Sequence, residues 1–574
     1  MRKTLMMFAI LMLVLAVSAY STDKNRVTIE SYPLILGNEP LPDIPYYPSE
    51  PGLITDSPGE IVGSTQYDYQ TNGSSGRRIV LDSQGGVHFA WMNGINYDAG
   101  TRAVYFNYVD SQGNWLYPEE GAAISQANGA GYVQLELTND DLAVIAYHQW
   151  QLADYAVLAL DNFPGMGIFS YFDIPDMLEF RCYWPYIAVD RNNNMHVIVN
   201  EQDGFAMGYT RSTNGGETWS TLATVDSLMT LSGVVVASPV SDKVTIAYTH
   251  PRDLENQWYN DIYFIESEDG LTWDWRSGRI NLTEYGGAET FWAYIDIAAV
   301  YDYNDNLNIS WNALTSLDDE LYYPVILFHY STGSESITEI TASPEDWDES
   351  CATGGWNLPI AKMSLGVNEA TNAIYTTYTA FDLNDCSAGG FTNGDLWMNY
   401  SVDGGASWSN GVNMTDSQTP GCAPGECDSD HWSTLAEKVD DNLHIVYIND
   451  KDAGGIAQTE GTPTDNPVLY LEYPNPVTSI DDDSRMPKTF TLAQNYPNPF
   501  NAETKIGFEL VEAMNVDVAV YNIAGAKVAQ LHKGILDAGA HAVSWDAEDV
   551  SSGVYYYQLS TDNETRTKKM VLLK

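Results

Sequence analysis

The sequence predicts an all-β protein, a β-propeller of six to eight blades followed by a small β-sandwich. The composition is the first indication: 38 Tyr, 16 Trp and 45 Gly among 574 residues, with only 18% charged residues, favour strands joined by turns over helices. The second is an internal repeat of a strand, a tight polar turn and another strand. The third is a short turn pattern ending in Trp that recurs within several of these repeats.

The internal repeat is clearest where residues 78–82 lead to 87–91 and where residues 186–190 lead to 195–199. Looser copies lie around Leu137 and Tyr147, Val236 and Tyr248, Ala299 and Trp311, Leu365 and Tyr378, and Leu435 and Tyr447. Seven copies of about 50 to 70 residues match the spacing of four-stranded propeller blades. Six or eight blades are also compatible, because the copies at Leu137 and Leu365 are weak.

Two changes in composition bound the propeller at residues 61–472. Residues 20–60 contain seven prolines, which disfavour regular sheet and predict an extended arm or linker. Residues 473–487 contain Tyr-Pro-Asn-Pro and then Asp481, Asp482 and Asp483, which predict an acidic linker. A C-terminal module over residues 488–574 follows it.

The N-terminus has the pattern of a signal peptide. Arg2 and Lys3 precede an apolar run over residues 5–17, and Val17-Ser18-Ala19, with the small residues that a signal peptidase needs, places the cleavage after Ala19. The apolar run is too short for the roughly 20 residues that a membrane-spanning helix needs. Since no other stretch is long and apolar enough, we expect no transmembrane segment in the mature chain.

The recurrent turn has the form Ser-x-Asp/Asn-x-Gly-x-x-Trp at residues 212–219 and 401–408, and lacks one residue at 267–273. A degenerate copy lies at residues 110–115. These turns resemble the Asp boxes of the sialidase superfamily and related propellers. In such a box the Asp or Asn side chain accepts backbone N–H groups, Gly takes a positive φ, and Trp packs between neighbouring sheets, so its role is structural. The expected members are Ser212, Asn214, Gly216, Trp219, Ser267, Asp269, Trp273, Ser401, Asp403, Gly405 and Trp408.

The C-terminal module, residues 488–574, alternates apolar and polar residues in about seven short segments, the pattern of a small sandwich. Its opening Tyr-Pro-Asn-Pro-Phe-Asn, its Gly-Val-Tyr-Tyr-Tyr hairpin and its basic, apolar end closely resemble type IX secretion C-terminal sorting domains and the related Ig-like domain of flagellar hook-capping proteins. The resemblance implies recognition by type IX-like secretion machinery and export through the periplasm, to the outer cell surface or the medium. An Ig-like spacer without a sorting role is the alternative.

The net charge of −52 belongs almost entirely to the part of the chain before this module, since residues 486–574 have 8 Lys and Arg against 10 Asp and Glu. Such a field repels nucleic acid and anionic lipid, so we expect neither as a partner. A solubilising surface explains the acidity, and structural Ca²⁺ is the alternative, although the sequence contains no twelve-residue calcium loop. We expect no other cofactor.

Five cysteines remain in a chain that is predicted to be exported, where disulfides are permitted. Cys422 and Cys427 could close a small loop, and Cys351 and Cys386 both lie in long Gly-rich insertions. Cys182 has no obvious partner. The spacing does not fix the pairing.

Sialidases that resemble this fold use three arginines, a Tyr nucleophile assisted by Glu, and an Asp acid/base. Alignment on Pro185 puts Tyr183 where the family has its first arginine, so we assign no catalytic residue. Aromatic residues instead precede the inner strands, where flat rings suit sugars or peptide side chains. The candidates for a ligand-binding funnel are Arg77, Arg181, Tyr183, Trp292, His431 and Trp432. Alternatively, the aromatic residues only pack between blades.

The sequence therefore predicts a non-catalytic, exported recognition or adhesion propeller that binds an extracellular glycan or protein. A sialidase-like exo-glycoside hydrolase is the alternative. We expect Trp432 to be a partly exposed platform for the ligand, and Trp184, which precedes Pro185, to be a buried wedge between blades.

Overall fold

The computed structural model describes residues 27, 55–71, 73–94, 101–149, 155–176, 182–201, 206–228, 232–252, 258–285, 291–317, 320–345, 347, 350–477, 490–492, 495, 498, 500–510, 513–522, 527–547, 550–561, 565–572 and 574. The predicted signal peptide, most of the Pro-rich arm and most of the acidic linker lie outside these residues. The chain divides into two compact units, Met1–Thr478 and Ser479–Lys574.

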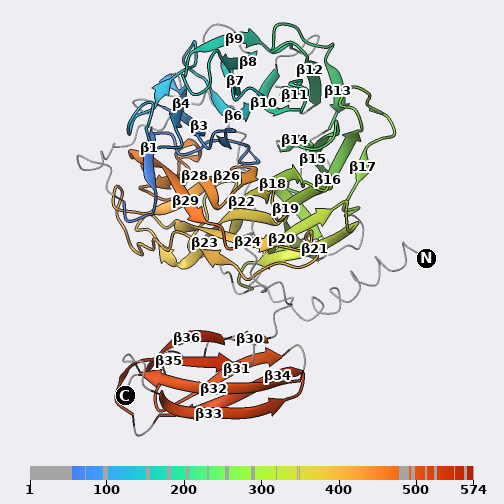
Figure 1. Ribbon diagram of the computed structural model, residues 1–574. Coiled ribbons are helices and arrows are strands. Elements are labelled where there is room, and N and C mark those ends of the chain that lie inside the picture. Colours follow the sequence, from blue (N-terminus) through green and yellow to red (C-terminus); the bar gives the residue numbers. More distant parts are fainter. Residues whose placement is uncertain are drawn as a thin grey trace. The chain divides into compact units, whose positions relative to one another are not determined.

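The first unit is a β-propeller of seven four-stranded blades arranged in a ring, which confirms the predicted fold (Figure 1). The first blade has β2 (Ile79–Leu81), β3 (Val87–Asn93), β4 (Ala103–Val109) and β5 (Ala122–Ala123). The second has β6 (Gly131–Leu137), β7 (Ala143–Gln149), β8 (Tyr155–Asp161) and β9 (Phe169–Asp173). The third has β10 (Cys182–Val189), β11 (Met195–Glu201), β12 (Met207–Ser212) and β13 (Ala223–Asp226).

The fourth blade has β14 (Gly233–Ala237), β15 (Val244–Pro251), β16 (Asn260–Ser267) and β17 (Ile280–Asn281). The fifth has β18 (Phe291–Tyr301), β19 (Leu307–Leu317), β20 (Glu320–Ser331) and β21 (Ser336–Ala342). The sixth has β22 (Ile360–Asn368), β23 (Ile374–Cys386), β24 (Thr392–Ser401) and β25 (Val412–Asn413), with β27 (Lys438–Val439) beside β22.

The seventh blade closes the ring by combining strands from both ends of the unit. It has β26 (Ser429–Leu435), β28 (Asn442–Asp450), β29 (Asn466–Pro474) and, outermost, β1 (Glu60–Thr65). β1 pairs antiparallel with β29, from Glu60 opposite Tyr470 to Thr65 opposite Asn466. The residues that follow β1 are thereby placed next to loops that lie nearly 400 residues later in the chain.

The blades pack through apolar faces, because their central strands are buried on both sides. Each Trp of the recurrent turn follows the third strand of its blade and packs on the blade before it. Trp219 contacts the core that β7 and β8 share with β10 and β11. Trp273 contacts the core between the third and fourth blades. The ring of Trp408 lies edge-on to His329 of β20. The turns have the expected local bonds: Gly216 N donates to Ser212 Oγ at 2.9 Å and Ser407 N to Asp403 Oδ1 at 2.9 Å.

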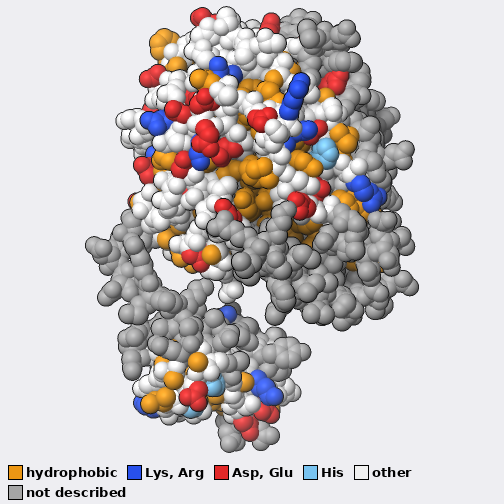
Figure 2. Space-filling model, turned by 90° about the vertical axis from the view of Figure 1, so that its right-hand side faces the viewer, with side chains coloured by type: hydrophobic (Ala, Val, Ile, Leu, Met, Phe, Trp, Pro, Cys, Tyr) orange, Lys and Arg blue, Asp and Glu red, His pale blue; other side chains and the backbone are white. Residues whose placement is uncertain are grey.

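The propeller surface is mainly polar. Figure 2 shows one side of it, on which acidic and basic side chains surround a group of hydrophobic ones. Exposed large hydrophobic side chains include Phe163, Met166, Ile168, Leu271 and Ile280. Within the part of the chain that the structure describes, no helix has the length and hydropathy of a membrane span.

The second unit is a sandwich of two antiparallel sheets. One has β30 (Phe490–Leu492), β31 (Glu503–Leu510) and β34 (Gly539–Asp546), and the other has β33 (Lys527–Leu536), β32 (Met514–Asn522), β35 (Gly553–Ser560) and β36 (Thr565–Leu572). Alternate residues of these strands face a common core that includes Ile506, Val518, Trp545, Tyr557 and Met570. The alternation in the sequence thus corresponds to one buried face for each sheet.

Candidate functional site

The innermost strands of five blades are irregular at the same point. Their pairing shifts between Gly131 and Gln134, Tyr183 and Tyr186, Ala293 and Ile297, Ala361 and Ser364, and His431 and Thr434. In four of them the first unpaired residue has a left-handed φ: 54° at Tyr132, 47° at Trp184, 56° at Lys362 and 56° at Trp432. Large side chains rarely adopt a left-handed backbone conformation, so the fold must impose it at these four residues. A bulge also changes the direction in which its side chain points.

The side chains at these bulges meet one another near the centre of the ring. The rings of Tyr132 and Trp184 are 6.1 Å apart, and Lys362 Nζ lies 4.8 Å from the centre of the Trp432 ring. Lys362 Nζ also donates to Asp296 Oδ1 at 3.1 Å, with both side chains buried. Four or more blades therefore contribute to a single cluster of aromatic and charged residues.

The structure buries the predicted funnel residues that it describes. Tyr183, Trp292, His431 and Trp432 all lie on innermost strands and are buried, and Trp432 is 2% exposed against 7% for Trp184. The expectation that Trp432 forms an exposed platform is therefore wrong. Tyr69, from the segment after β1, packs edge-on to its ring at 5.2 Å, and Lys362 lies over it.

Of the two predicted arginines, the structure describes Arg77. Arg77 precedes β2 and lines the central channel beside residues of the innermost strands of the other six blades, and it forms ion pairs with Glu136 and Glu437. Burial raises the pKa of Glu437, although Arg77 opposes the effect. Both carboxylates engage the guanidinium of Arg77, and its role as a ligand-binding residue stays a prediction. Arg181 lies outside the described residues.

A pocket opens beside Trp432, between the sixth and seventh blades and the segment after β1. We call it the His431 pocket. Its lining residues are Asp68, Tyr69, Thr353, Gly355, Asn357, Phe381, Ser429, His431, Trp432, Gly454 and Gly455. They come from five places: the segment after β1, the loop that precedes β22, strand β23, strand β26, and the loop between β28 and β29. Because the first of these lies at the start of the propeller and the last near its end, only closure of the ring assembles this pocket.

His431 is the unusual polar residue of the His431 pocket. Its side chain is buried, and among the described residues neither ring nitrogen has a hydrogen-bond partner. Its Nε2 lies 3.6 Å from Asp450 Oδ2, an oxygen that also has no hydrogen-bond partner there. Burial, with the positive charges of Lys362 and Arg78, lowers the pKa of His431 to about 3, so the imidazole is neutral at neutral pH.

Asp68 forms the acidic side of the His431 pocket. Its carboxylate accepts the backbone N–H of Ile456 at 3.0 Å. Burial and the neighbouring charges of Asp450 and Glu460 raise the pKa of Asp68 well above its ordinary value. Burial and the charge of Asp452 likewise raise the pKa of Asp450. Across the residues described, no Lys or Arg forms an ion pair with Asp68 or Asp450.

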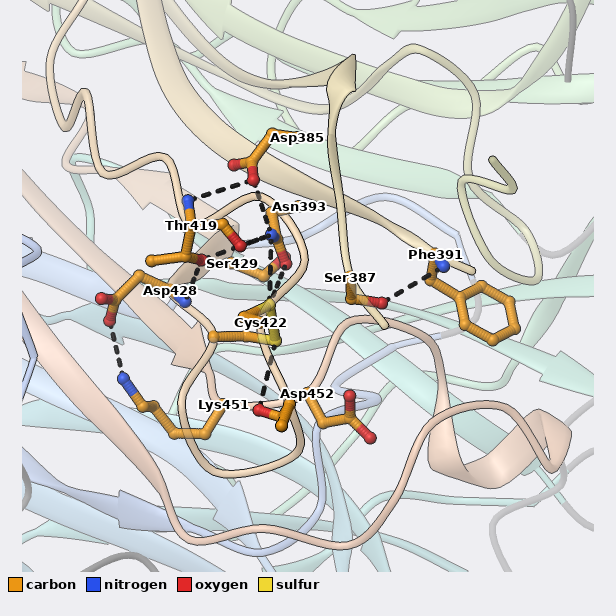
Figure 3. Close-up of a disulfide and its surroundings, with 12 residues drawn as sticks. Asp385, Ser387, Phe391, Asn393, Thr419, Cys422, Asp428, Ser429, Lys451 and Asp452 are labelled. Carbon is orange, nitrogen blue, oxygen red and sulfur yellow. Dashed lines mark hydrogen bonds and ion pairs between the residues drawn. A yellow bond between two sulfur atoms is a disulfide. The ribbon is translucent and has the colours of Figure 1, made fainter. Parts of the chain in front are cut away.

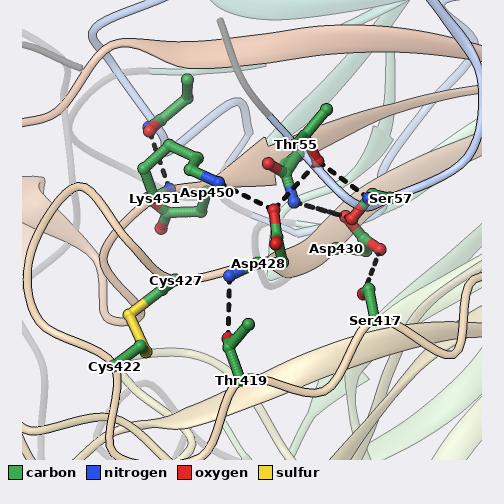
Figure 4. A network of polar contacts seen from close by, with 12 residues as sticks. Thr55, Ser57, Ser417, Thr419, Cys422, Cys427, Asp428, Asp430, Asp450 and Lys451 are labelled. Atoms are coloured by element: carbon green, nitrogen blue, oxygen red, sulfur yellow. Dashed lines mark hydrogen bonds and ion pairs between the residues drawn. A yellow bond between two sulfur atoms is a disulfide. The ribbon is translucent and has the colours of Figure 1, made fainter. Parts of the chain in front are cut away.

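A polar network supports the strand that carries His431 (Figure 4). Asp430 accepts hydrogen bonds from Ser417 Oγ at 2.7 Å and Asn449 Nδ2 at 2.8 Å. Burial raises the pKa of Asp430 to about 7. The neighbouring Asp428 accepts from Lys451 Nζ at 2.7 Å and Thr55 Oγ1 at 2.9 Å.

Two disulfides fix the loops around this network. Cys351 pairs with Cys386, and Cys422 pairs with Cys427, so these two do close a small loop, while Cys182 is a buried free thiol. Figure 3 shows the bond at Cys422, beside which Asp385 accepts from Asn393 Nδ2 at 3.0 Å and Thr419 N at 3.0 Å. Within the described ranges, no three His, Cys, Asp or Glu side chains are arranged to hold a metal ion.

The first comparison with known proteins concerns the second unit, the sandwich. Residues 494–573 match the secretion system C-terminal sorting domain. The chain therefore carries a sorting domain, and the protein is exported, to the cell surface or the medium. The match covers only this unit, and no curated protein matches the chain.

The propeller resembles solved structures only at low identity. An ulvan lyase, solved with a bound saccharide, is 10% identical, with 72% of this chain and 96% of that chain covered and a TM-score of 0.43. A Hadza microbial sialidase is 12% identical, with 65% and 73% covered and a TM-score of 0.33. An α-L-arabinofuranosidase from Fusarium graminearum is 11% identical, with 59% and 97% covered and a TM-score of 0.36. Identities this low say nothing about activity.

Several residues of the site gave no signal in the sequence. Asp68 and Tyr69 belong to a short segment without a recognisable pattern, and Lys362 lies in one of the weakest repeats. The position of Lys362 could have been found from its equivalence to Trp432, since each is the first unpaired residue of the bulge in its innermost strand. That equivalence is visible only once the strands are aligned in space.

Proposed function

We propose that this exported protein is a non-catalytic recognition propeller that binds an extracellular glycan at the His431 pocket, a cavity of about 10 Å³ that admits one polar group of the ligand. The observation that carries the proposal is the imidazole of His431, which is buried beside aromatic rings with no hydrogen-bond partner among the described residues. A buried polar group without a partner costs about 1 to 3 kcal/mol, so such groups in folded proteins call for an explanation. One explanation is a ligand that supplies the missing hydrogen-bond partner.

The chemistry of the His431 pocket suits a sugar. A neutral imidazole offers one donor and one acceptor, which match hydroxyl groups. Asn357 Oδ1 is also buried in the wall without a hydrogen-bond partner among the described residues. The rings of Tyr69, Phe381 and Trp432 form the apolar part of the pocket lining.

A sialidase-like hydrolase would need three arginines that converge on one carboxylate. Among the described residues, Arg77 is engaged in the central channel, while Arg78 donates to Thr434 Oγ1 and to the carbonyl of Trp432. Arg102 lies over the ring of Tyr67 at 4.8 Å. Because these three arginines have separate protein partners, the geometry favours recognition over sialidase chemistry.

The test is a glycan-array screen of the full chain, followed by the same screen on His431→Phe. The substitution keeps an aromatic ring but removes both ring nitrogens, and we expect binding to weaken about tenfold or more. His329→Gln is the matched control, because His329 is equally buried but lies in the fifth blade and has Asn308 as a partner at 3.1 Å. Undiminished binding by His431→Phe, or turnover of a fluorogenic sialoside by the full chain, would contradict the proposal.

A further inference from the structure

We infer that the glycan bound in the His431 pocket carries a free, positively charged amine, as in a de-N-acetylated amino sugar, and that this amine binds at Asp68. The inference rests on the proposed glycan recognition and adds the chemical class of the ligand. Three features of the pocket support it: its buried carboxylates, the distribution of charge along it, and its aromatic walls.

The carboxylates are the first feature. Asp68 is 5% exposed and lines the pocket, and its carboxylate accepts hydrogen bonds from the backbone N–H of Ile456. Behind it, Asp450 is 1% exposed, and its Oδ2 has no hydrogen-bond partner among the described residues. The nearby Lys451 is committed to Asp428, as Figure 4 shows. Among the described residues neither carboxylate has an ion pair with Lys or Arg, and a ligand cation would supply one to Asp68.

The charge distribution is the second feature. The neighbouring charges that act on Asp68 are negative, from Asp450 and Glu460. The charges of Lys362 and Arg78, which are positive, lower the pKa of His431, although Asp450 Oδ2 lies 3.6 Å from its Nε2. Asp296 compensates the charge of Lys362 at 3.1 Å. A cationic group is therefore favoured at Asp68 and disfavoured at His431, which gives the ligand one orientation.

The aromatic walls are the third feature. Tyr69 and Trp432 meet edge-on with their centres 5.2 Å apart, and Phe381 belongs to the same wall. The face of an aromatic ring attracts a cation, by about 0.5 to 2 kcal/mol according to how far the pair is desolvated. Lys362 over the ring of Trp432 is one such contact already present in the protein. An ammonium group beside Asp68 would combine this attraction with a charge-assisted hydrogen bond.

The same geometry predicts that binding is linked to a proton. Burial and the charges of Asp450 and Glu460 raise the pKa of Asp68, which favours its protonated form in the empty pocket. An ammonium group favours the ionised carboxylate, so its arrival should release a proton to the solvent. A neutral sugar should release none.

The experiment compares three oligosaccharides of four sugars by calorimetry on the full chain: the tetramer of glucosamine, the tetramer of N-acetylglucosamine, and cellotetraose. We expect the glucosamine tetramer to bind at least about tenfold more tightly than the other two, because a hydrogen bond to a charged group usually strengthens binding by about that factor. Its binding heat should depend on the ionisation enthalpy of the buffer, because a proton is released. Asp68→Asn should abolish both effects, and Asp56→Asn, at an exposed acid shortly before β1, should change neither.

Equal affinity for the three tetramers, or an amine preference that survives in Asp68→Asn, would overturn this inference while leaving glycan recognition intact. A blank glycan array would instead contradict the proposed function itself. If Ca²⁺ alone bound with the same proton release and displaced the amino sugar, the acidic side would be a metal site, and the inference would be wrong. Should Asp68→Asn fail to fold in a thermal melt, the selectivity and proton release of the unmodified protein still decide the outcome.

Discussion

Lys362 Nζ lies 3.1 Å from Asp296 Oδ1, and both side chains are 1% exposed. Lys362 belongs to β22 and Asp296 to β18, so this ion pair joins the innermost strands of the fifth and sixth blades. Asp296 also accepts hydrogen bonds from Asn312 Nδ2 and from the backbone N–H of Lys362. The pair therefore fixes the Lys362 bulge, and with it the cation over Trp432.

Removal of one partner of this pair should destabilise the propeller strongly. Lys362→Met leaves Asp296 buried without a counter-ion, and we expect a loss of about 3 to 5 kcal/mol in the free energy of unfolding. Urea denaturation followed by tryptophan fluorescence measures it. Arg191→Met is the control, because the Arg191–Asp242 pair is about half exposed and should contribute less than about 1 kcal/mol. Similar losses in the two variants would contradict the structural role given to Lys362.

Trp432 and Trp184 should behave alike, because both side chains are buried at bulges of innermost strands. Replacing either by Ala removes a large packed ring, and we expect each to cost about 3 to 5 kcal/mol of stability. Thermal melts of the two variants provide the comparison. A small change in Trp432→Ala alone would restore the picture of an exposed platform.

His431 should make the propeller less stable as the pH falls. Its pKa is about 3 in the folded protein, against an ordinary value of 6.5, so between these values the unfolded chain binds a proton that the folded chain does not. Stability should therefore decrease by up to about 1.4 kcal/mol per pH unit below pH 6.5. Asp430, with its pKa raised to about 7, acts in the opposite direction, since the folded chain takes up the proton first.

The contribution of His431 is obtained by difference. Unfolding free energies of the unmodified protein and of His431→Phe are measured from pH 7.5 to pH 4.5 in steps of one unit. The variant should lose less stability than the unmodified protein as the pH falls. Parallel curves would show that His431 is protonated in the folded state after all.

The two disulfides should differ in their contributions to stability because they close loops of different length. Cys351 and Cys386 are 35 residues apart and Cys422 and Cys427 only 5. Loop-closure entropy predicts about 4 kcal/mol for the long loop and about 2 kcal/mol for the short one. Urea denaturation of the paired Cys→Ser variants tests the order. A larger loss from the short loop would mean that the disulfide acts mainly by holding the network around Thr419.

Deletion of residues 479–574 should leave the propeller folded but prevent its export to the cell surface. The deleted residues form a separate unit with its own core, so the propeller loses none of its own packing. Cell fractionation measures the export of the truncated protein, and a thermal melt measures whether it is folded. A reporter fused to residues 479–574, with the same N-terminal 26 residues, should reach the surface. If the truncated protein were found there instead, the second unit would be a spacer.

Local sequence patterns determined the blades and their turns. Alternating apolar residues around Val87 and Met195, and the turns at Ser212 and Ser401, depend on neighbours within about ten positions, so a single chain segment is enough to specify them. For the same reason the turn tryptophans Trp219, Trp273 and Trp408 could be assigned equivalent places. The C-terminal sandwich was predictable from its own strand pattern.

Only the tertiary structure decided the site. Ring closure through β1 carries Asp68 and Tyr69 to Trp432, more than 360 positions away in the sequence, and this contact is what buries the ring that was expected to be exposed. The charge of Asp68 likewise depends on Asp450 and Glu460, which reach it from the far end of the propeller. No local pattern encodes such meetings, because burial and pKa are set by whatever surrounds a side chain in space, and in a closed ring those surroundings come from both ends of the chain.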